Sequence, residues 1–169
     1  GEMDFVLSDG SIDRLGDKIN PNGWHLEAFQ ENPVALFNHK SNEPPVGKWE
    51  NLRVENGRLI GRLVFAKQGT SDRINELRAL AEQGILRAVS VGFKPLEAET
   101  FKEGDRIGTH YKEQELLEAS IVSIPANANA LAIMRSLNIS DDVRRLVFGV
   151  PAEKDQAQPR RIHIGVPAE

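Results

Sequence analysis

The sequence contains no cysteine, so no disulfide can staple this chain and no thiolate can act in it as nucleophile or metal ligand. This absence fits a reducing compartment. A basic excess is also missing, because 21 Lys and Arg stand against 25 Asp and Glu and leave a formal net charge of −4. No apolar run approaches the roughly 20 residues that span a bilayer, and no signal peptide is recognisable. We therefore expect neither a nucleic acid nor a membrane as partner.

What is present suits a globular domain: 169 residues, 40% of them hydrophobic and 27% charged. We expect one main domain over residues 1–137, followed by a C-terminal helix and a linker-like tail over residues 138–169. The tail carries the one internal repeat, Gly-Val-Pro-Ala-Glu, at residues 149–153 and 165–169. The polar stretch between the two copies favours a linker over a second folded unit.

Hydrophobic periodicity and turn signals predict the elements of the main domain. Strands are predicted over residues 3–7, 34–38, 46–54, 58–65, 87–93 and 111–124. Helices are predicted over residues 24–30, 71–83, 130–137 and 140–148. The charged stretch 97–108 lacks periodicity and indicates a mobile loop or the tip of a hairpin.

The strand predicted over residues 87–93 presents two different faces. Val89, Val91 and Phe93 alternate on the face that can fill a core. The other face carries Ser90 between two small residues, which leaves room for a peptide to approach its hydroxyl. Ser90 is therefore a candidate nucleophile, provided that the chain supplies a base and an acid to orient the base.

His39 is the best base candidate among the four histidines, because it follows an apolar strand and precedes a polar, proline-rich loop. Glu118 is the best orienting acid. It lies within the apolar run Leu-Leu-Glu-Ala-Ser-Ile-Val at residues 116–122, where a buried carboxylate needs a partner. Taken singly, each of the three residues also has a non-catalytic interpretation. Ser90 can be an ordinary strand serine, His39 a histidine at the end of a strand, and Glu118 an edge residue that faces water.

An ordered set of motifs favours the catalytic interpretation of these three residues over the non-catalytic one. The chain resembles the prohead (capsid maturation) serine proteases of tailed bacteriophages, whose fold is similar to that of herpesvirus assemblin. The resemblance covers roughly residues 3–136 and rests on these stretches: residues 23–29 (GWHLEAF), 32–39 (NPVALFNH), 45–47 (PVG), 88–93 (AVSVGF) and 117–127 (LEASIVSIPAN).

The resemblance implies a role for each candidate. Ser90 is the nucleophile and His39 the general base, while Glu118 takes the third position, which assemblin-type proteases fill with a second histidine. A carboxylate can accept the imidazole N–H there and stabilise the imidazolium. The motifs identify the hydrogen-bond donors of the oxyanion hole less clearly than the three catalytic residues. Backbone N–H groups at Ala126 and Asn127, with charge from Arg87, are the candidates, although the Pro-Ala-Asn bend has an equally good reading as a simple turn.

The expected reaction is peptide-bond hydrolysis through an acyl-enzyme, with no metal and no cofactor. The resemblance implies as substrates the scaffold, an N-terminal segment of the major capsid protein and the protease itself by autocleavage. It also implies that the protein acts in the host cytoplasm, inside the assembling prohead. The sequence leaves open whether the chain forms a homo-oligomer. Because both repeat copies end in Glu, Val-Pro-Ala-Glu is a candidate cleavage-site sequence, and a fortuitous or appended repeat explains it equally well.

The sequence is also compatible with two other functions. The first is a catalytically inactive capsid-assembly or scaffold-docking module of the same fold, which the presence of all three catalytic residue types disfavours. The second is another hydrolase with the same three residues, although no Gly-x-Ser-x-Gly elbow surrounds Ser90. The expected fold is α+β: a mainly antiparallel, partly closed β-barrel of about six or seven strands flanked by helices.

Overall fold

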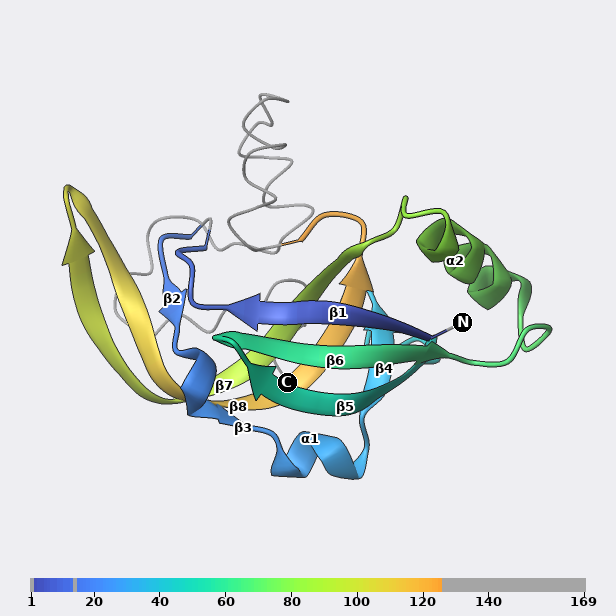
Figure 1. The fold of residues 1–169 in the computed structure, drawn as a ribbon, viewed down its shortest axis with the longest axis horizontal. Coiled ribbons are helices and arrows are strands. Elements are labelled where there is room, and N and C mark those ends of the chain that lie inside the picture. Colours follow the sequence, from blue (N-terminus) through green and yellow to red (C-terminus); the bar gives the residue numbers. More distant parts are fainter. Residues whose placement is uncertain (1, 14, 126–169) are drawn as a thin grey trace.

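The computed structural model describes residues 2–13 and 15–125. The helices expected at residues 130–137 and 140–148, the repeated peptide and the whole tail over residues 138–169 lie outside this part. Within it the chain forms one sheet and three helical segments (Figure 1). The strands are β1 (Glu2–Asp9), β2 (Lys18–Ile19), β3 (Trp24–His25), β4 (Val34–Phe37), β5 (Gly47–Glu55), β6 (Arg58–Phe65), β7 (Ala88–Glu103) and β8 (Arg106–Val122). The helical segments are η1 (Pro21–Gly23), α1 (Glu27–Glu31) and α2 (Asp72–Glu82).

The sheet curls into a barrel that does not close. Its main path runs β1-β6-β5-β4-β8, and β8 also pairs with β7, β2 and β3. β1 returns to contact β7 but forms no ladder with it, so a gap remains between these two strands. The ladders β1–β6, β6–β5, β5–β4 and β7–β8 are antiparallel, whereas β4, β3 and β2 lie parallel to β8. The predicted α+β, partly closed barrel is confirmed.

The core fills the barrel interior with alternate residues of its strands. Trp49, Leu63 and Phe93 are among the most deeply buried side chains. Trp49 also donates a hydrogen bond from Nε1 to the Ala119 carbonyl at 3.0 Å, which satisfies its polar atom. This bond fixes β8 from the inside, beside the residues of the candidate site.

The helix α2 forms where the sequence predicts a helix. Ser71 caps it by accepting the N–H of Ile74 at 3.2 Å, and Asp72 lies in the first turn. Ile74 and Leu77 bury the apolar stripe against the core. No helix within the described residues is long and apolar enough to cross a membrane.

The stretch 97–108 is not an irregular loop. β7 and β8 continue through it as the outer part of a long hairpin, which turns tightly at Gly104 and extends away from the barrel (Figure 1). The hairpin-tip reading is therefore the correct one of the two. Most side chains of this arm are exposed, so it needs no continuous apolar face.

The helix predicted over residues 24–30 is half wrong. Trp24 and His25 form the short strand β3, and the helix α1 covers only Glu27–Glu31. Gly23 explains the difference, since a Cβ there would lie 1.9 Å from the Lys112 carbonyl oxygen. The backbone presses directly on β8 at this glycine, so the next two residues join the ladder opposite Gln114 and Glu115.

Candidate active site

The pairing of β7 with β8 determines which side chains share the outer face of the barrel. Ser90 lies opposite Ser120, and Gly92 lies opposite Glu118. Cross-strand partners project to the same face, while their neighbours in the two strands project into the core. Ser90 is 4% exposed and Ser120 is fully buried.

A β-bulge at Leu117 gives Glu118 this orientation. The ladder pairs Gly92 with Glu118 but Phe93 with Leu116, so Leu117 is the extra residue. Leu116 and Ala119 both face the core, although a regular strand would send residues three apart to opposite faces. The bulge thus changes the phase of β8 and turns Glu118 away from the core.

His39 reaches the same face from the other side of β8. β4 runs parallel to β8 and ends at Phe37. Asn38 and His39 then adopt left-handed backbone conformations, with φ of 50° and 60°. Such backbone is rare for residues other than glycine and costs about 1–2 kcal/mol per residue. The turn bends the chain over the sheet and leaves His39 only 4% exposed.

Two hydrogen bonds of Asn38 hold this turn in place. Its N–H donates to the Ile121 carbonyl at 3.0 Å, and its side-chain Oδ1 accepts the N–H of Ser123 at 3.1 Å. The two bonds tether the end of β4 to the end of β8. The position of His39 over β8 is thereby fixed by the residue before it.

The structure brings the predicted base and acid into direct contact. His39 Nδ1 is hydrogen-bonded to Glu118 Oε1, and the Glu118 side chain is 12% exposed. Since an ionised carboxylate can only accept, Nδ1 donates this bond, and Nε2 is the ring nitrogen left to act as a base. Ser120 Oγ donates to the other carboxylate oxygen, Oε2, at 2.7 Å.

Gly92 has a different purpose from the one the sequence suggests. A Cβ at this position would lie 2.9 Å from Glu118 Oε1 and 3.0 Å from Glu118 Cγ. The space that the missing side chain leaves is therefore occupied by the Glu118 carboxylate rather than kept open for a substrate. The small residue beside Ser90 thus makes room for the Glu118 side chain.

The far nitrogen of His39 has no partner. Nε2 is buried and makes no hydrogen bond within residues 2–13 and 15–125, so Ser90 Oγ is not bonded to it. Burying an unpaired nitrogen costs about 1–3 kcal/mol, and such atoms gather at functional sites. Catalytic contacts in unliganded enzymes are often longer than in the substrate complex. The arrangement can accept a proton at Nε2 while Glu118 stabilises the resulting imidazolium.

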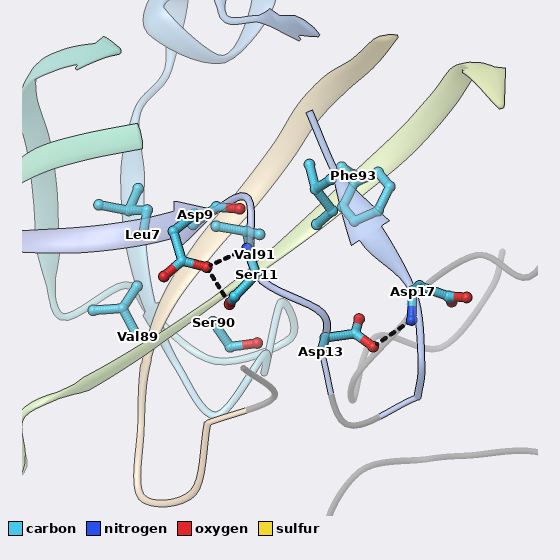
Figure 2. A pocket seen from close by; sticks show the side chains of 11 residues that line it. Leu7, Asp9, Ser11, Asp13, Asp17, Val89, Ser90, Val91 and Phe93 are labelled. Carbon is cyan, nitrogen blue, oxygen red and sulfur yellow. Dashed lines mark hydrogen bonds between the residues drawn. The ribbon is translucent and has the colours of Figure 1, made fainter. Parts of the chain in front are cut away.

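Ser90 also borders a pocket on the open side of β7 (Figure 2). The pocket lies in the gap between β7 and the end of β1 with its following loop. Leu7, Val89, Val91 and Phe93 supply its apolar part, and Asp9, Ser11, Asp13 and Asp17 supply its polar part. Asp9 Oδ1 accepts bonds from the N–H and Oγ of Ser11 (Figure 2).

Asp13 is a carboxylate of this pocket with a strongly raised pKa. Its pKa is raised to about 6, mainly by burial and in part by the neighbouring Asp17 carboxylate, against the lowering effect of the backbone N–H groups whose hydrogen bonds it accepts. Its Oδ1 accepts the N–H of Leu15 at 2.8 Å and that of Asp17 at 3.0 Å. Asp13 therefore keeps the loop after β1 folded, and sequence patterning gave no sign of its burial.

The remaining predicted site residues are placed as follows. Arg87 is exposed immediately before β7, and Ala126 and Asn127 lie outside the described residues. His25 is not helical, and its Nε2 lies 3.2 Å from Glu113 Oε2 in an exposed side-chain contact. No group of three or more His, Cys, Asp or Glu in the described part of the chain could hold a metal ion.

A serine, a histidine bonded to a carboxylate, and an open strand edge beside them are the components of a serine protease. The chain matches the sequence profile of the caudovirus prohead serine protease over residues 5–142. It is 29% identical over 159 residues to the prohead protease of Escherichia phage T5, covering 90% of this chain and 72% of that protein.

It is 34% identical over 140 residues to the prohead protease of Enterobacteria phage HK97, covering 79% of this chain and 60% of that protein. It is also 25% identical over 149 residues to a capsid polyprotein of Pseudomonas phage PAJU2, covering 86% of this chain and 21% of that protein. No solved structure matches the chain, so the similarity to assemblin stays a prediction.

The chain belongs to the family of caudovirus prohead serine proteases. The predicted family and the predicted enzyme class are confirmed: this is a serine protease of phage prohead maturation.

Proposed function

We propose that Ser90, His39 and Glu118 form the catalytic triad of this protease. One observation supports the proposal above the others: three segments distant in sequence place these residue types on one face. Ser90 on β7 lies opposite Ser120 on β8, and His39, in the turn after β4, is hydrogen-bonded to Glu118. Neither the ladder register nor the turn after β4 requires a histidine or a glutamate at these positions.

In the proposed mechanism His39 Nε2 takes the Ser90 hydroxyl proton as the oxygen attacks the scissile carbonyl. Glu118 holds the Nδ1 proton and stabilises the imidazolium that forms. The imidazolium then protonates the leaving amine, which leaves an acyl group on Ser90. Water, deprotonated by His39, hydrolyses this ester and restores the enzyme.

The substrate is proposed to bind as an extended segment along β7. In the described part of the chain β7 pairs only with β8, and its other edge faces the gap beside β1. An unpaired strand edge offers backbone N–H and C=O groups to an added strand. Ser90 lies at this edge and borders the pocket (Figure 2), so a bound segment would pass the nucleophile.

Capsid components are the proposed substrates, because two relatives are named prohead protease and a third is named capsid polyprotein. We infer the major capsid protein, the scaffold and the protease itself, inside a prohead that assembles in the host cytoplasm. Cleavage after Val-Pro-Ala-Glu in the tail is part of this proposal. Mass spectrometry of a longer precursor tests it, and termini elsewhere than after Glu153 or Glu169 would reject it.

The first prediction is that Ser90→Ala abolishes processing of the phage's major capsid protein when the two proteins are produced together. The circular dichroism spectrum should not change, because alanine fits a small buried strand position. Ser123→Ala, at an exposed serine just beyond β8, is the matched control and should process normally. Continued cleavage by Ser90→Ala would show that another group is the nucleophile, and a loss common to both variants would point to a folding defect.

A further inference from the structure

Ser120 is fully buried, yet its hydroxyl contacts two residues of the proposed triad. Oγ lies 2.7 Å from Glu118 Oε2 and 3.1 Å from the backbone nitrogen of His39. It also lies on the strand position directly opposite Ser90. No other described side chain is bonded to both the proposed base and the proposed acid.

The chemistry of the partners determines the direction of both bonds. A backbone N–H can only donate, so the Ser120 oxygen must accept from His39. An ionised carboxylate can only accept, so the single hydroxyl proton must point to Glu118 Oε2. The hydroxyl thus has one orientation that satisfies both neighbours, and it is the orientation required when Glu118 carries its charge.

The two bonds constrain different degrees of freedom. With Oε2 held by Ser120 and Oε1 bonded to His39 Nδ1, neither carboxylate oxygen can turn away from its partner. The bond to the His39 N–H supports a backbone that is otherwise strained, since φ is 60° at this residue. One side chain therefore fixes the rotation of the carboxylate and the backbone position of the imidazole.

We propose that Ser120 is a positioning residue of the protease, which locks Glu118 and His39 into the geometry that activates Ser90. This inference rests on the proposed triad. It differs from a purely structural role in one respect. A hydroxyl that only satisfied buried groups would affect stability, whereas a positioning hydroxyl affects the chemical step at a given stability.

The experiment compares Ser120→Ala, Ser120→Thr, Ser90→Ala and the exposed control Ser123→Ala in the full chain. Two rates are measured: cleavage of the major capsid protein, separated into kcat and KM, and covalent labelling by a fluorophosphonate probe, which reacts only with an activated serine. Thermal unfolding of each variant is recorded alongside. Threonine keeps the hydroxyl, so it tests rescue without the loss of the two bonds.

For Ser120→Ala we expect kcat and the labelling rate to fall together by about 10- to 100-fold, the loss for a bond to a charged group. KM should stay within about twofold, since a group that only positions the base contributes little to ground-state binding. Ser120→Thr should recover most of the labelling rate. Ser123→Ala should match the unaltered protein.

Two outcomes overturn the inference, and each is distinct from a failure of the triad. Wild-type kcat in a folded Ser120→Ala variant, with Ser90→Ala inactive, would leave the triad and remove Ser120 from it. Equal losses in Ser120→Ala and in a folded Ser120→Thr would show that the hydroxyl bonds are not what matters. Activity in Ser90→Ala would instead reject the proposed function itself.

Discussion

At the scale of single residues, Glu118 has an environment made for one charged group. It accepts bonds at both oxygens, from His39 and from Ser120, and it occupies the space left by Gly92. A carboxylate so enclosed must be paired, because desolvation of an unpaired charge costs several kcal/mol. The structure supplies that pairing with the residue which, in the proposed mechanism, needs an anion beside it.

Glu118→Gln is predicted to lower kcat by about a thousandfold or more while the protein stays folded. An amide has nearly the same shape, but it cannot stabilise an imidazolium, and its NH2 group favours the wrong tautomer of His39. Steady-state kinetics with the major capsid protein measure the loss. Glu113→Gln, at an exposed glutamate of the same strand, is the control. Equal rates for Glu118→Gln and the unaltered protein would contradict the role of Glu118.

Gly92→Ala is predicted to lower kcat by about 10- to 100-fold, because the new methyl group displaces the Glu118 carboxylate and a misplacement of about 1 Å costs this much. The effect is specific to the acid. In a Glu118→Ala background the same substitution should cause little further loss. An equal loss in both backgrounds would show that the methyl group acts through the substrate or through folding instead.

At the scale of elements, three features of the backbone create the site: the turn after β4, the bulge at Leu117 and the register of the β7–β8 ladder. The turn delivers His39, the bulge turns Glu118 outward, and the register sets Ser90 beside them. None of these is a long or irregular loop. Ser90 and Glu118 lie on strands, which hold side chains more rigidly than loops do, and His39 lies in a tight turn tethered to β8.

Asn38 is predicted to be the residue on which the turn depends. Asn38→Gly keeps access to the left-handed backbone and loses only the bond to the Ser123 N–H. Asn38→Ala loses that bond and also pays the left-handed penalty, so it should be less stable than Asn38→Gly by about 1 kcal/mol. Urea unfolding measures both variants. Equal stability of the two would mean that the turn relaxes when Asn38 is replaced.

The candidate residues were predictable from the sequence because each has a local signature: a serine among small residues, a histidine ending an apolar strand, a glutamate inside one. The bulge at Leu117 has no such signature. Strict alternation through residues 116–122 would place Leu116, Glu118 and Ser120 on one face, whereas only Leu116 faces the core. Ser120 has no local signature either, since one of its two partners, His39, lies on a segment distant in sequence.

At the scale of the whole molecule, the barrel leaves one seam open between β1 and β7, and the acidic pocket lies in it (Figure 2). Asp13 lies in this seam with its pKa raised to about 6, mainly by burial. A carboxyl group whose pKa rises on folding binds its proton more tightly in the folded state. Its contribution to stability is therefore present at low pH and is lost as the pH rises through about 6.

Asp13→Asn is predicted to remove this pH dependence. The amide oxygen can still accept the two backbone N–H groups, and no charge has to be buried. The variant should melt about 3 to 6 °C above the unaltered protein at pH 7.5, and the difference should shrink at pH 4.5. Asp105→Asn, at the exposed tip of the hairpin, is the control. A difference that is the same at both pH values would contradict the role of Asp13.

The proposed triad is tested most directly by finding which residue a fluorophosphonate modifies. The protein is incubated with the probe, digested and mapped by mass spectrometry, beside a His39→Ala variant. The triad predicts a single adduct on Ser90, formed at least about a hundredfold more slowly without the His39 imidazole. An adduct on another serine, or labelling of Ser90 at the same rate in His39→Ala, would contradict it.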